Sequence, residues 1–501
     1  MAVRLGQFRR NPVSFGYNAV EDRGRRQAPR TIVISEDDVL NATKRRKLQA
    51  TAKDQPRNVS ILAWMLRRHL DYVSRFAPHI RTGIPEIDKK VISLLKWHGH
   101  RDNFDIAGRH GRDDFMRIFE ASKSIDGDVL AIKLDSGHLQ GIEGDLVAKP
   151  SDLDNVPKQY QEKISQHGLV LNDQLRVEKY CLCKRQSING TGRDFVRLID
   201  RDDAIFDGYF SRFSQTRGIS LFAPTVNMVQ DMSETLEWVA LKAKLHALFG
   251  LAFKRQATGG MRWNKDGYSD STNNEDTTKN PYEVQITPRG IFTLDLDPGD
   301  DVTPIESKEP STELLGFTRE EIRMILLALD IPFTAYDSMQ ASFSARIADR
   351  AEYEESAADK RRKNAEVLTE YSSWKLVRWA SQPEVLGDLL AKNKLSLPEL
   401  QTQLEWIPAG TPWLDKQSEI RGDQLAVGMG ADSTPRVARR RGLDAYQIID
   451  EQAEFLAYAK DAGVPIYNAA PGQVSDNPAS SPADDAPADN PKPAPKPKDR
   501  K

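Results

Sequence analysis

Cysteine is nearly absent from this sequence, which has only Cys181 and Cys183 among its 501 residues. A disulfide framework is thereby excluded, and we expect a reducing compartment. The two cysteines lie in "YCLCKR", where the single intervening residue would place both thiols on the same face of a strand. A zinc site would need two further sulfur or imidazole ligands at suitable spacing, so we interpret the pair as small strand residues.

Long hydrophobic runs are also missing. No stretch of about 18 apolar residues could span a bilayer, and the Arg-rich N-terminus lacks the apolar run of a signal peptide. We therefore expect a protein that is made in the cytoplasm and has no membrane contact. Residues 1–40 are predicted to form a flexible basic arm. Residues 466–501, rich in Pro, Ala, Asp and Lys, are predicted to be a disordered tail.

An excess of positive charge is the next absence, because the formal net charge is −2. A protein coated in Lys and Arg for nucleic-acid binding is thus excluded, and any contact with DNA should be local or weak. The hydrophobic fraction of 39% and the charged fraction of 29% are typical of a soluble globular protein. The length predicts two to four structural regions.

Recognisable catalytic motifs are absent as well. The phosphate-binding pattern G-x-x-x-x-G-K-[ST] does not occur, and "SFSAR" is not the G-x-S-x-G turn of a hydrolase. We therefore expect no enzyme activity, no cofactor and no metal. One alternative remains open, a metal-dependent nuclease or hydrolase that acts in DNA processing. Its ligands would come from a loop whose spacing follows no known signature: His98, His100, Asp102, Asp105, His110 and Asp113.

The order of the predicted elements is α+β over roughly the first 215 residues, followed by a helix at 221–253 and a turn-rich β segment at 254–311. A second helix follows at 312–332. Thr318 and Glu321 have the spacing of a capping box near its start, and Pro332 ends it. A loop of small, polar residues at 333–343 leads into a long helix at 344–380.

The helix at 344–380 is unusual because its middle, "DRAEYEESAADKRRKN", offers almost no apolar stripe. A solvent-exposed helix is the plain interpretation. The alternative is that small and charged residues contact neighbouring copies of the same chain, so that the helix stands in a ring and needs little core of its own.

Several motifs in this order resemble those of the lambda-type portal proteins of tailed phages. They include "RNVSILAWMLRRHLDYV", the helix before "SIDGDVLAIKL", "SRFSQTRGISLFAPTV" with its R-x-x-Q-x-R-G-x-x-x-x-A-P pattern, and "ALDIPFTAYDSMQASFSARIADRAEYE". A fifth begins at "WIPAGTPWLDK" and runs to "RRRGLDAYQIIDEQAEF". The resemblance covers residues 40 to 465. Where the family has Gly before the loop proline this chain has Asp330, and the family's "DP" reads Leu414-Asp415.

The resemblance implies an α+β portal fold with a mixed α/β wing, long stem helices, a small β-rich clip, a long charged helix and a helical crown. The implied parts are a wing at 41–220, stem helices at 221–253 and 312–332, a clip at 254–311, a tunnel loop at 333–343 and a C-terminal wing and crown region at 381–465. The tunnel loop would face the DNA channel with Asp337, Ser338, Met339, Gln340 and Ser342. The following helix would contact neighbouring subunits through Arg350, Glu354, Lys360 and Arg361.

The function that the resemblance implies is a homo-oligomeric ring, usually of twelve subunits, at one vertex of the capsid. The ring would be the channel for genome packaging and ejection, assembled in the host cytoplasm and retained in the virion. Its partners would be the large terminase subunit, a head-tail adaptor, the major capsid and scaffolding proteins, and double-stranded DNA bound without sequence specificity. Uncharged loop side chains would suit this role, because they neither hold phosphates strongly nor read bases.

Overall fold

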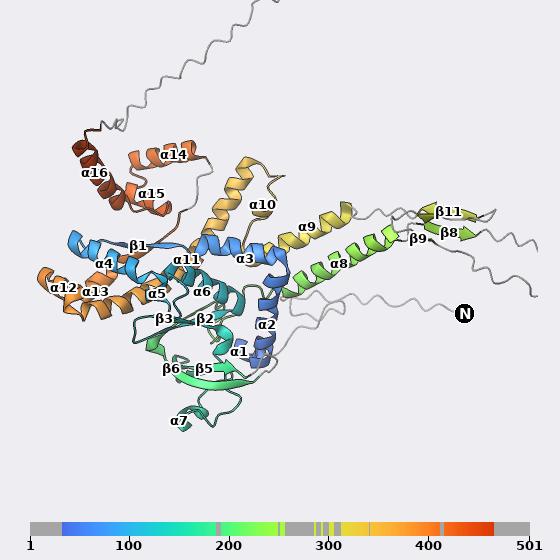
Figure 1. Ribbon diagram of the computed structural model, residues 1–501, viewed down its shortest axis with the longest axis horizontal. Helices are drawn as coiled ribbons and strands as arrows, with labels where there is room; N and C mark the ends of the chain where they lie inside the picture. The colour runs from blue at the N-terminus through green and yellow to red at the C-terminus, as the bar shows by residue number, and fades with distance from the viewer. Residues whose placement is uncertain are drawn as a thin grey trace, which may run out of the picture. The chain divides into compact units, whose positions relative to one another are not determined.

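A computed structural model describes residues 33–186, 192–248, 251–255, 285–286, 292–293, 300–304, 312–339, 341–410 and 415–464. The chain divides into two compact units, Met1–Arg421 and Gly422–Lys501. Figure 1 shows the helices and strands of both units.

Three helices open the first unit: α1 (Glu36–Val39), α2 (Ala42–Asn58) and α3 (Ser60–Val73). The first two have side-chain N-caps, because Ser35 accepts from the backbone N–H of Asp38 and Asn41 accepts from that of Lys44. The predicted arm at 1–40 therefore extends too far at its C-terminal end, where residues 36–39 are helical. Residues 1–32 lie outside the described part of the chain.

Two three-stranded antiparallel sheets follow. In the first, β2 (Asp128–Lys133) lies between β3 (Leu139–Glu143) and β7 (Ala204–Gly208). In the second, β5 (Val177–Arg185) lies between β4 (Leu169–Leu171) and β6 (Arg193–Asp200). Alternation along β2 divides the interior: Leu130 and Ile132 join the core shared with the second sheet, whereas Val129 and Ala131 face a core made with helices.

The cysteine pair lies on β5 as the sequence predicts. Cys181 and Cys183 are both buried and free, and they share one small hydrophobic cluster with Val170. Leu182, between them, belongs to the cluster on the opposite face of the strand. Both cysteines are therefore structural strand residues.

The helical core of the first unit includes α4 (Pro85–His98), α5 (Arg101–Phe104), α6 (Arg112–Asp126) and the long helix α11 (Phe343–Ala380). Residues 381–410 join the same core through η5 (Pro383–Gly387), α12 (Asp388–Asn393), α13 (Leu397–Thr402) and β12 (Leu404–Pro408). β12 pairs antiparallel with β1 (Phe76–Ile80), which lies more than 300 residues earlier in the chain. Residues 381–410 thus pack with the N-terminal part of the chain.

The long helix α11 has two different halves. Its C-terminal half is buried in the core through Val367, Leu368, Tyr371, Leu376 and Trp379. Over residues 342–348, around its start, every residue is exposed. The expectation of a helix with little core of its own is therefore wrong for the C-terminal half. The sequence pattern misled because these apolar residues follow the charged stretch and do not run along the whole helix.

The helices α8 (Val226–Leu248) and α9 (Thr312–Leu326) pack against each other and are both shorter than predicted. Residues Leu251–Arg255 form β8, which pairs with β11 (Asp300–Pro304), and residues Leu327–Leu329 form the 3-10 turn η4. The capping box is also wrong, because Thr318 lies inside α9 and its hydroxyl donates to the carbonyl of Leu314. A second strand pair joins β9 (Gln285–Ile286) to β10 (Phe292–Thr293). The other residues predicted for the β segment at 254–311 lie outside the described ranges.

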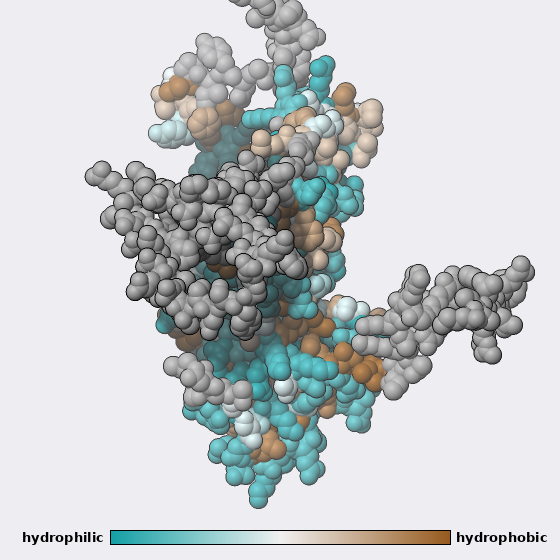
Figure 2. Space-filling model, turned by 90° about the vertical axis from the view of Figure 1, so that its right-hand side faces the viewer, coloured by the Kyte–Doolittle hydropathy of each residue, from teal (hydrophilic) through white to brown (hydrophobic). Residues whose placement is uncertain are grey.

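The helices α8 and α9 carry large exposed hydrophobic side chains: Leu236, Trp238, Leu241, Leu315, Phe317 and Met324. Figure 2 shows brown hydrophobic patches interrupting a mostly hydrophilic face of the molecule. Among the described residues, no helix is long and apolar enough to cross a membrane. Exposed apolar surface of this kind is typical of contacts with other protein chains.

The second unit consists of most of α14 (Lys416–Gly428) together with α15 (Thr434–Arg440) and α16 (Ala445–Asp461). Within residues 422–464, only Ala445 and Ala459 are buried. The whole tail predicted at 466–501 lies outside the described residues.

Candidate functional site

The segment between α9 and α11 begins with a left-handed turn at Asp330, whose φ is 57°. This conformation favours glycine, the residue that the portal family has here, and Asp is one of the few side chains that also adopt it. The Asp330 carboxylate then accepts from the Ser356 hydroxyl at 2.5 Å and from the Lys360 ammonium at 2.9 Å, both on α11. Asp330 therefore adopts the left-handed turn and also links this turn to the long helix α11 through two side-chain contacts.

The first half of the predicted loop is helical. Residues Phe333–Tyr336 form α10, and the Thr334 hydroxyl donates to the carboxylate of Asp349 on α11 at 2.7 Å. The Phe333 ring lies under the guanidinium of Arg323 on α9, 4.9 Å from the ring centroid. The loop prediction at 333–343 is thus wrong for residues 333–336, because these residues pack between two helices.

The second half of the predicted loop is open. Asp337 forms an ion pair with Arg319 and accepts from the backbone N–H of Met339 at 3.0 Å. Ser338 is exposed, and the side chain of Met339 is 93% exposed. Gln340 lies outside the described residues.

Ser342 has a structural role that the sequence reading missed. It is the N-cap of α11, where its hydroxyl accepts from the backbone N–H of Ala345 at 3.2 Å. Of the five residues predicted to line a channel, Asp337 and Ser342 therefore fix the local backbone, while Ser338 and Met339 present their side chains to solvent.

Three of the four residues predicted for subunit contact have partners within the chain. Glu354 pairs with Arg361, and Lys360 pairs with Asp330. Arg350 has no carboxylate partner among the described residues. It lines a cleft of about 230 Å³ with two further arginines, Arg68 and Arg346. Sequence reasoning did not assign a role to Arg68 or Arg346, although the i,i+4 spacing of Arg346 and Arg350 could have indicated a shared helix face.

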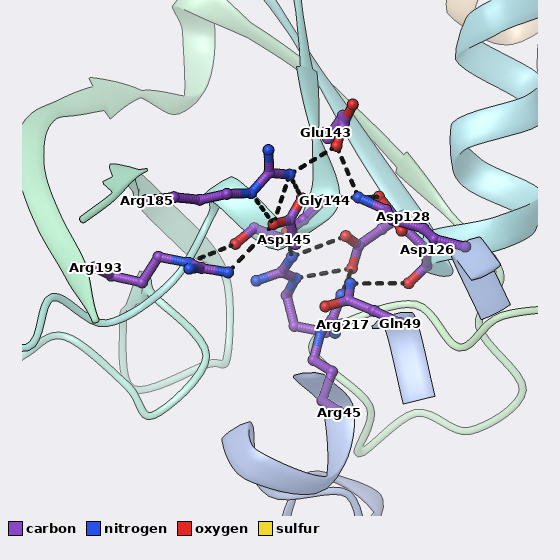
Figure 3. A network of polar contacts seen from close by, with 11 residues as sticks. Arg45, Gln49, Asp126, Asp128, Glu143, Gly144, Asp145, Arg185, Arg193 and Arg217 are labelled. Atoms are coloured by element: carbon purple, nitrogen blue, oxygen red, sulfur yellow. Dashed lines mark hydrogen bonds and ion pairs between the residues drawn. The ribbon is translucent and has the colours of Figure 1, made fainter. Parts of the chain in front are cut away.

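A buried ion-pair network links α2, β2 and the segment before α8, and Figure 3 shows it from close by. The Asp128 carboxylate, fully buried at the start of β2, accepts from Arg45 at 2.8 Å and from two nitrogens of Arg217, each at 2.8 Å. Burial alone would raise the pKa of Asp128, but the two guanidinium groups hold it below its usual value. The Arg217 guanidinium also donates to the backbone carbonyls of Gly144, Val147 and His167.

Two sequence motifs meet in this network. Gly127-Asp128 comes from the helix-strand motif, and Arg217-Gly218 comes from the R-x-x-Q-x-R-G motif. A Cβ atom at Gly218 would lie 2.0 Å from the carbonyl oxygen of Gly127, so only glycine allows the two backbones to approach so closely. Gln215 of the same motif donates to the carbonyl of Arg217 at 2.8 Å. These motif residues therefore serve the fold.

A second buried network links α11 to α6 and α3. Lys123 on α6 pairs with Glu120 and Asp207, each at 2.7 Å, and donates to Asn364 of α11 at 2.8 Å. Asn364 in turn donates to the carbonyl of Val73 at the end of α3. The charged stretch of α11 is thus held in place through the side chain of Asn364. A polar residue of this kind does not stand out in a hydrophobicity pattern.

The metal-dependent alternative requires several ligand side chains that converge on one point. Within the described ranges, the grouping of ligand-type atoms that could hold an ion is Asp126, Glu143 and Asp145. The Lys53 ammonium lies 3.1, 2.7 and 2.9 Å from these three carboxylates and supplies the positive charge. Burial raises the pKa of Asp126 to about 7, which further limits its use as a ligand.

The histidines and aspartates of the loop at 98–113 are not brought together as a ligand set. Asp105 accepts from the backbone N–H groups of Ala107 and Arg109 and so shapes a turn. His98 lies against the Trp379 ring, with centroids 5.1 Å apart, and burial lowers its pKa to about 4. Both residues serve the fold, and the geometry gives the nuclease alternative no support.

Comparison with known families supplies the class of protein. Residues 23–359, about two thirds of the chain, match the family described as phage portal protein, lambda family. The chain therefore belongs to the lambda family of phage portal proteins. Portal proteins are structural and are not enzymes, which agrees with the prediction made from the missing catalytic motifs.

Individual relatives are distant. A curated relative named "Probable portal protein", from Halomonas phage phiHAP-1, is 24% identical over 172 residues, which cover 32% of this chain and 31% of the relative. The chain thus matches about a third of that relative's length. Among solved structures, a chain in the virion of a native gene transfer agent particle has a TM-score of 0.44 at 14% identity, covering 80% of this chain and 93% of that chain. A chain in the neck of the native particle, computed with C12 symmetry, has a TM-score of 0.45 at 13% identity with the same coverage.

Proposed function

We propose that this protein forms a ring at one vertex of a capsid and that the ring is the channel through which the genome is packaged and ejected. The observation that carries the proposal is family membership over residues 23–359. The buried contacts between Asp128 and Arg217 support it, because they give the shared motifs a physical role in the wing. The ring would remain in the virion after assembly in the host cytoplasm.

The parts of the chain suit distinct roles in such a ring. The wing would comprise residues 41–220 with 381–410, the stem would be α8 and α9, and the clip would lie between them. The exposed hydrophobic side chains of α8 and α9 would be covered by neighbouring subunits. The residues of the second unit would form the crown. The proposed ring has twelve subunits. Its proposed partners are a large terminase subunit, a head-tail adaptor, and the capsid and scaffolding proteins.

The experiment that tests the ring is a measurement of particle mass by light scattering together with negative-stain images of the purified protein. Rings of about a dozen subunits support the proposal. A protein that stays monomeric or dimeric over a wide range of concentration and salt, and that cleaves DNA when metal is added, would overturn it in favour of the nuclease.

The open segment before α11 is proposed as the tunnel loop. Ser338 and Met339 are exposed and uncharged, so DNA could slide past them without strong phosphate contacts. Replacing both by Lys would add two cationic groups per subunit, and each phosphate contact so formed would strengthen the hold on DNA as salt is lowered. Rings should still form, while packaged DNA length and infectious yield should fall.

The matched control places two lysines at exposed positions elsewhere on the first unit, Gln174→Lys with Gln403→Lys. This variant should package normally. Equal packaging by the two double-Lys variants would remove the segment at 337–342 from the channel. That result would not contradict the proposal that the protein forms a ring.

A further inference from the structure

The arginine cleft beside the proposed tunnel loop lacks its counter-charge. Its volume is about 230 Å³, and the lining residues come from α3, the segment after η4 and α11: Arg68, Tyr72, Ile331, Pro332, Thr334, Ala335, Arg346, Arg350 and Tyr353. Arg68 and Arg346 are exposed and Arg350 is half-buried. In the part of the chain that the structure describes, none of these three arginines forms an ion pair. The cleft therefore holds three formal positive charges.

The nearby carboxylates are already engaged. Asp349 accepts from Thr334, Asp337 pairs with Arg319, and Glu354 pairs with Arg361. Asp330 is held by Lys360 and Ser356. Among the described residues, Asp337, Glu354 and Asp330 are therefore paired with other cations, and Asp349, which is held by a hydroxyl, leaves the three arginines of the cleft with a net positive charge.

A buried hydroxyl in the cleft also lacks a partner. The Tyr353 side chain is only 5% exposed, and its hydroxyl has no hydrogen-bond partner within the described residues. Burial raises the pKa of Tyr353, so the hydroxyl keeps its proton and can donate. A buried unpaired hydroxyl costs free energy, which an incoming hydrogen-bond acceptor would recover.

The opposite face of α11 carries negative charges that lack partners. Glu352 and Glu355 are exposed, and neither has a cationic partner among the described residues. At 3.6 residues per turn, Arg346, Arg350 and Tyr353 share one face of the helix, while Glu352 and Glu355 lie on roughly the opposite face. The same helix therefore carries an unpaired basic face and an unpaired acidic face.

We propose that the arginine cleft of one subunit binds the carboxylates of Glu352 and Glu355 from α11 of the next subunit. This inference rests on the proposed ring and names the contact that closes it. Opposite faces of one helix meet head-to-tail in a heterologous interface, and such interfaces generate closed rings when the rotation closes. Arginine suits the role because its planar donors match a carboxylate in a bidentate geometry.

A phosphate group of DNA is the competing occupant of the cleft. The carboxylate is favoured because one contact between subunits would neutralise both the unpaired arginines and the unpaired glutamates, whereas a phosphate in the cleft would leave Glu352 and Glu355 unpaired on the opposite face of α11. The charge pattern of the helix therefore favours a second copy of the chain.

The test is a charge-reversal cycle on the full-length protein. One variant carries Arg346→Glu with Arg350→Glu, a second carries Glu352→Arg with Glu355→Arg, and a third combines all four changes. The readout is the protein concentration at which half of the chains are in rings, measured by light scattering near physiological salt. Each double variant should raise that concentration at least about tenfold, since like charges then face each other, and the combined variant should recover most of the loss.

Control measurements distinguish a failure of the proposed contact from a failure of ring formation. If the wild-type protein forms no rings, the proposed function fails before the cycle begins. Thermal unfolding followed by circular dichroism checks that each variant is folded. If the arginine reversal does not fold, Arg346→Gln with Arg350→Gln takes its place and should still weaken assembly.

Three results would overturn the inference. Ring formation by both double variants at the wild-type concentration would show that the faces do not meet. Loss of rings without recovery in the combined variant would show that these residues do not pair with each other. Normal rings with reduced DNA packaging in the arginine variant would assign the cleft to phosphate.

Discussion

Two arginine clusters of this protein contrast in almost every physical respect. Arg45 and Arg217 are buried around one carboxylate, with 2.8 Å contacts to Asp128. Arg346 and Arg350 line an open cleft and have no carboxylate partner in the described residues. The first cluster is complete within one chain, and the second is complete only when another molecule arrives.

The contrast teaches where each cluster acts. A buried guanidinium group without a counter-charge costs several kcal/mol, so a chain that buries two of them must supply an acid itself. An exposed arginine carries no such penalty, because water solvates it. Pairing within the chain therefore marks charges that serve the fold, and exposed charges without partners mark a surface available for binding.

The largest expected effect comes from breaking the buried cluster. Asp128→Ala would leave Arg45 and Arg217 buried without their shared carboxylate and should lower the free energy of unfolding by about 3–5 kcal/mol. Urea denaturation followed by circular dichroism measures the change. The control is Asp359→Ala, which removes an exposed carboxylate of α11 and should change stability by less than about 0.5 kcal/mol. A loss below about 1 kcal/mol in Asp128→Ala would mean that water reaches the two arginines.

An intermediate effect is expected at Lys375, which is buried like Arg45 and Arg217 and, like Arg346 and Arg350, has no carboxylate partner among the described residues. Its side chain is 2% exposed, its ammonium donates to the Gly137 carbonyl, and burial followed by the charge of Arg378 lowers its pKa to about 8. Between about pH 8 and the ordinary lysine pKa of 10.5, the unfolded chain holds this proton more readily than the folded protein, so the stability of the folded state should rise with pH in this window.

The measurement compares wild type with Lys375→Met between about pH 7.5 and pH 10. Relative to the variant, the wild-type protein should gain about 1–3 kcal/mol of unfolding free energy across that range. Lys392→Met, at an exposed lysine, is the control and should keep the wild-type slope. Identical slopes for wild type and Lys375→Met would show that the buried ammonium stays fully charged at no cost.

The smallest effect on stability is expected at the open cluster. Arg350→Ala should change the unfolding free energy of the dissociated chain by no more than about 0.5 kcal/mol, because no partner within the subunit is lost. The same change should weaken ring assembly. Arg362→Ala, whose guanidinium is already held by Asp359 and Glu366 on the same helix, is the matched control and should assemble normally. A large loss of stability in Arg350→Ala would place Arg350 with the buried cluster.

The class of the protein and much of its order of elements were predictable from the sequence alone. The paired cysteines on one strand face, the long helix ending at Ala380 and the motif resemblance to portal proteins were all correct, because each depends on local pattern or on residues close together in the chain.

The roles of the charged residues depend on contacts between distant segments, which the sequence pattern does not reveal. Arg217 pairs with a residue 89 positions earlier, Asn364 with one 241 positions earlier, and the cleft joins Arg68 of α3 to Arg346 and Arg350 of α11. The tertiary structure also showed that Glu354 and Lys360 are engaged within the chain. Periodicity reports which face of a helix is apolar, but the partner of a charge depends on which distant segments the fold brings within about 4 Å.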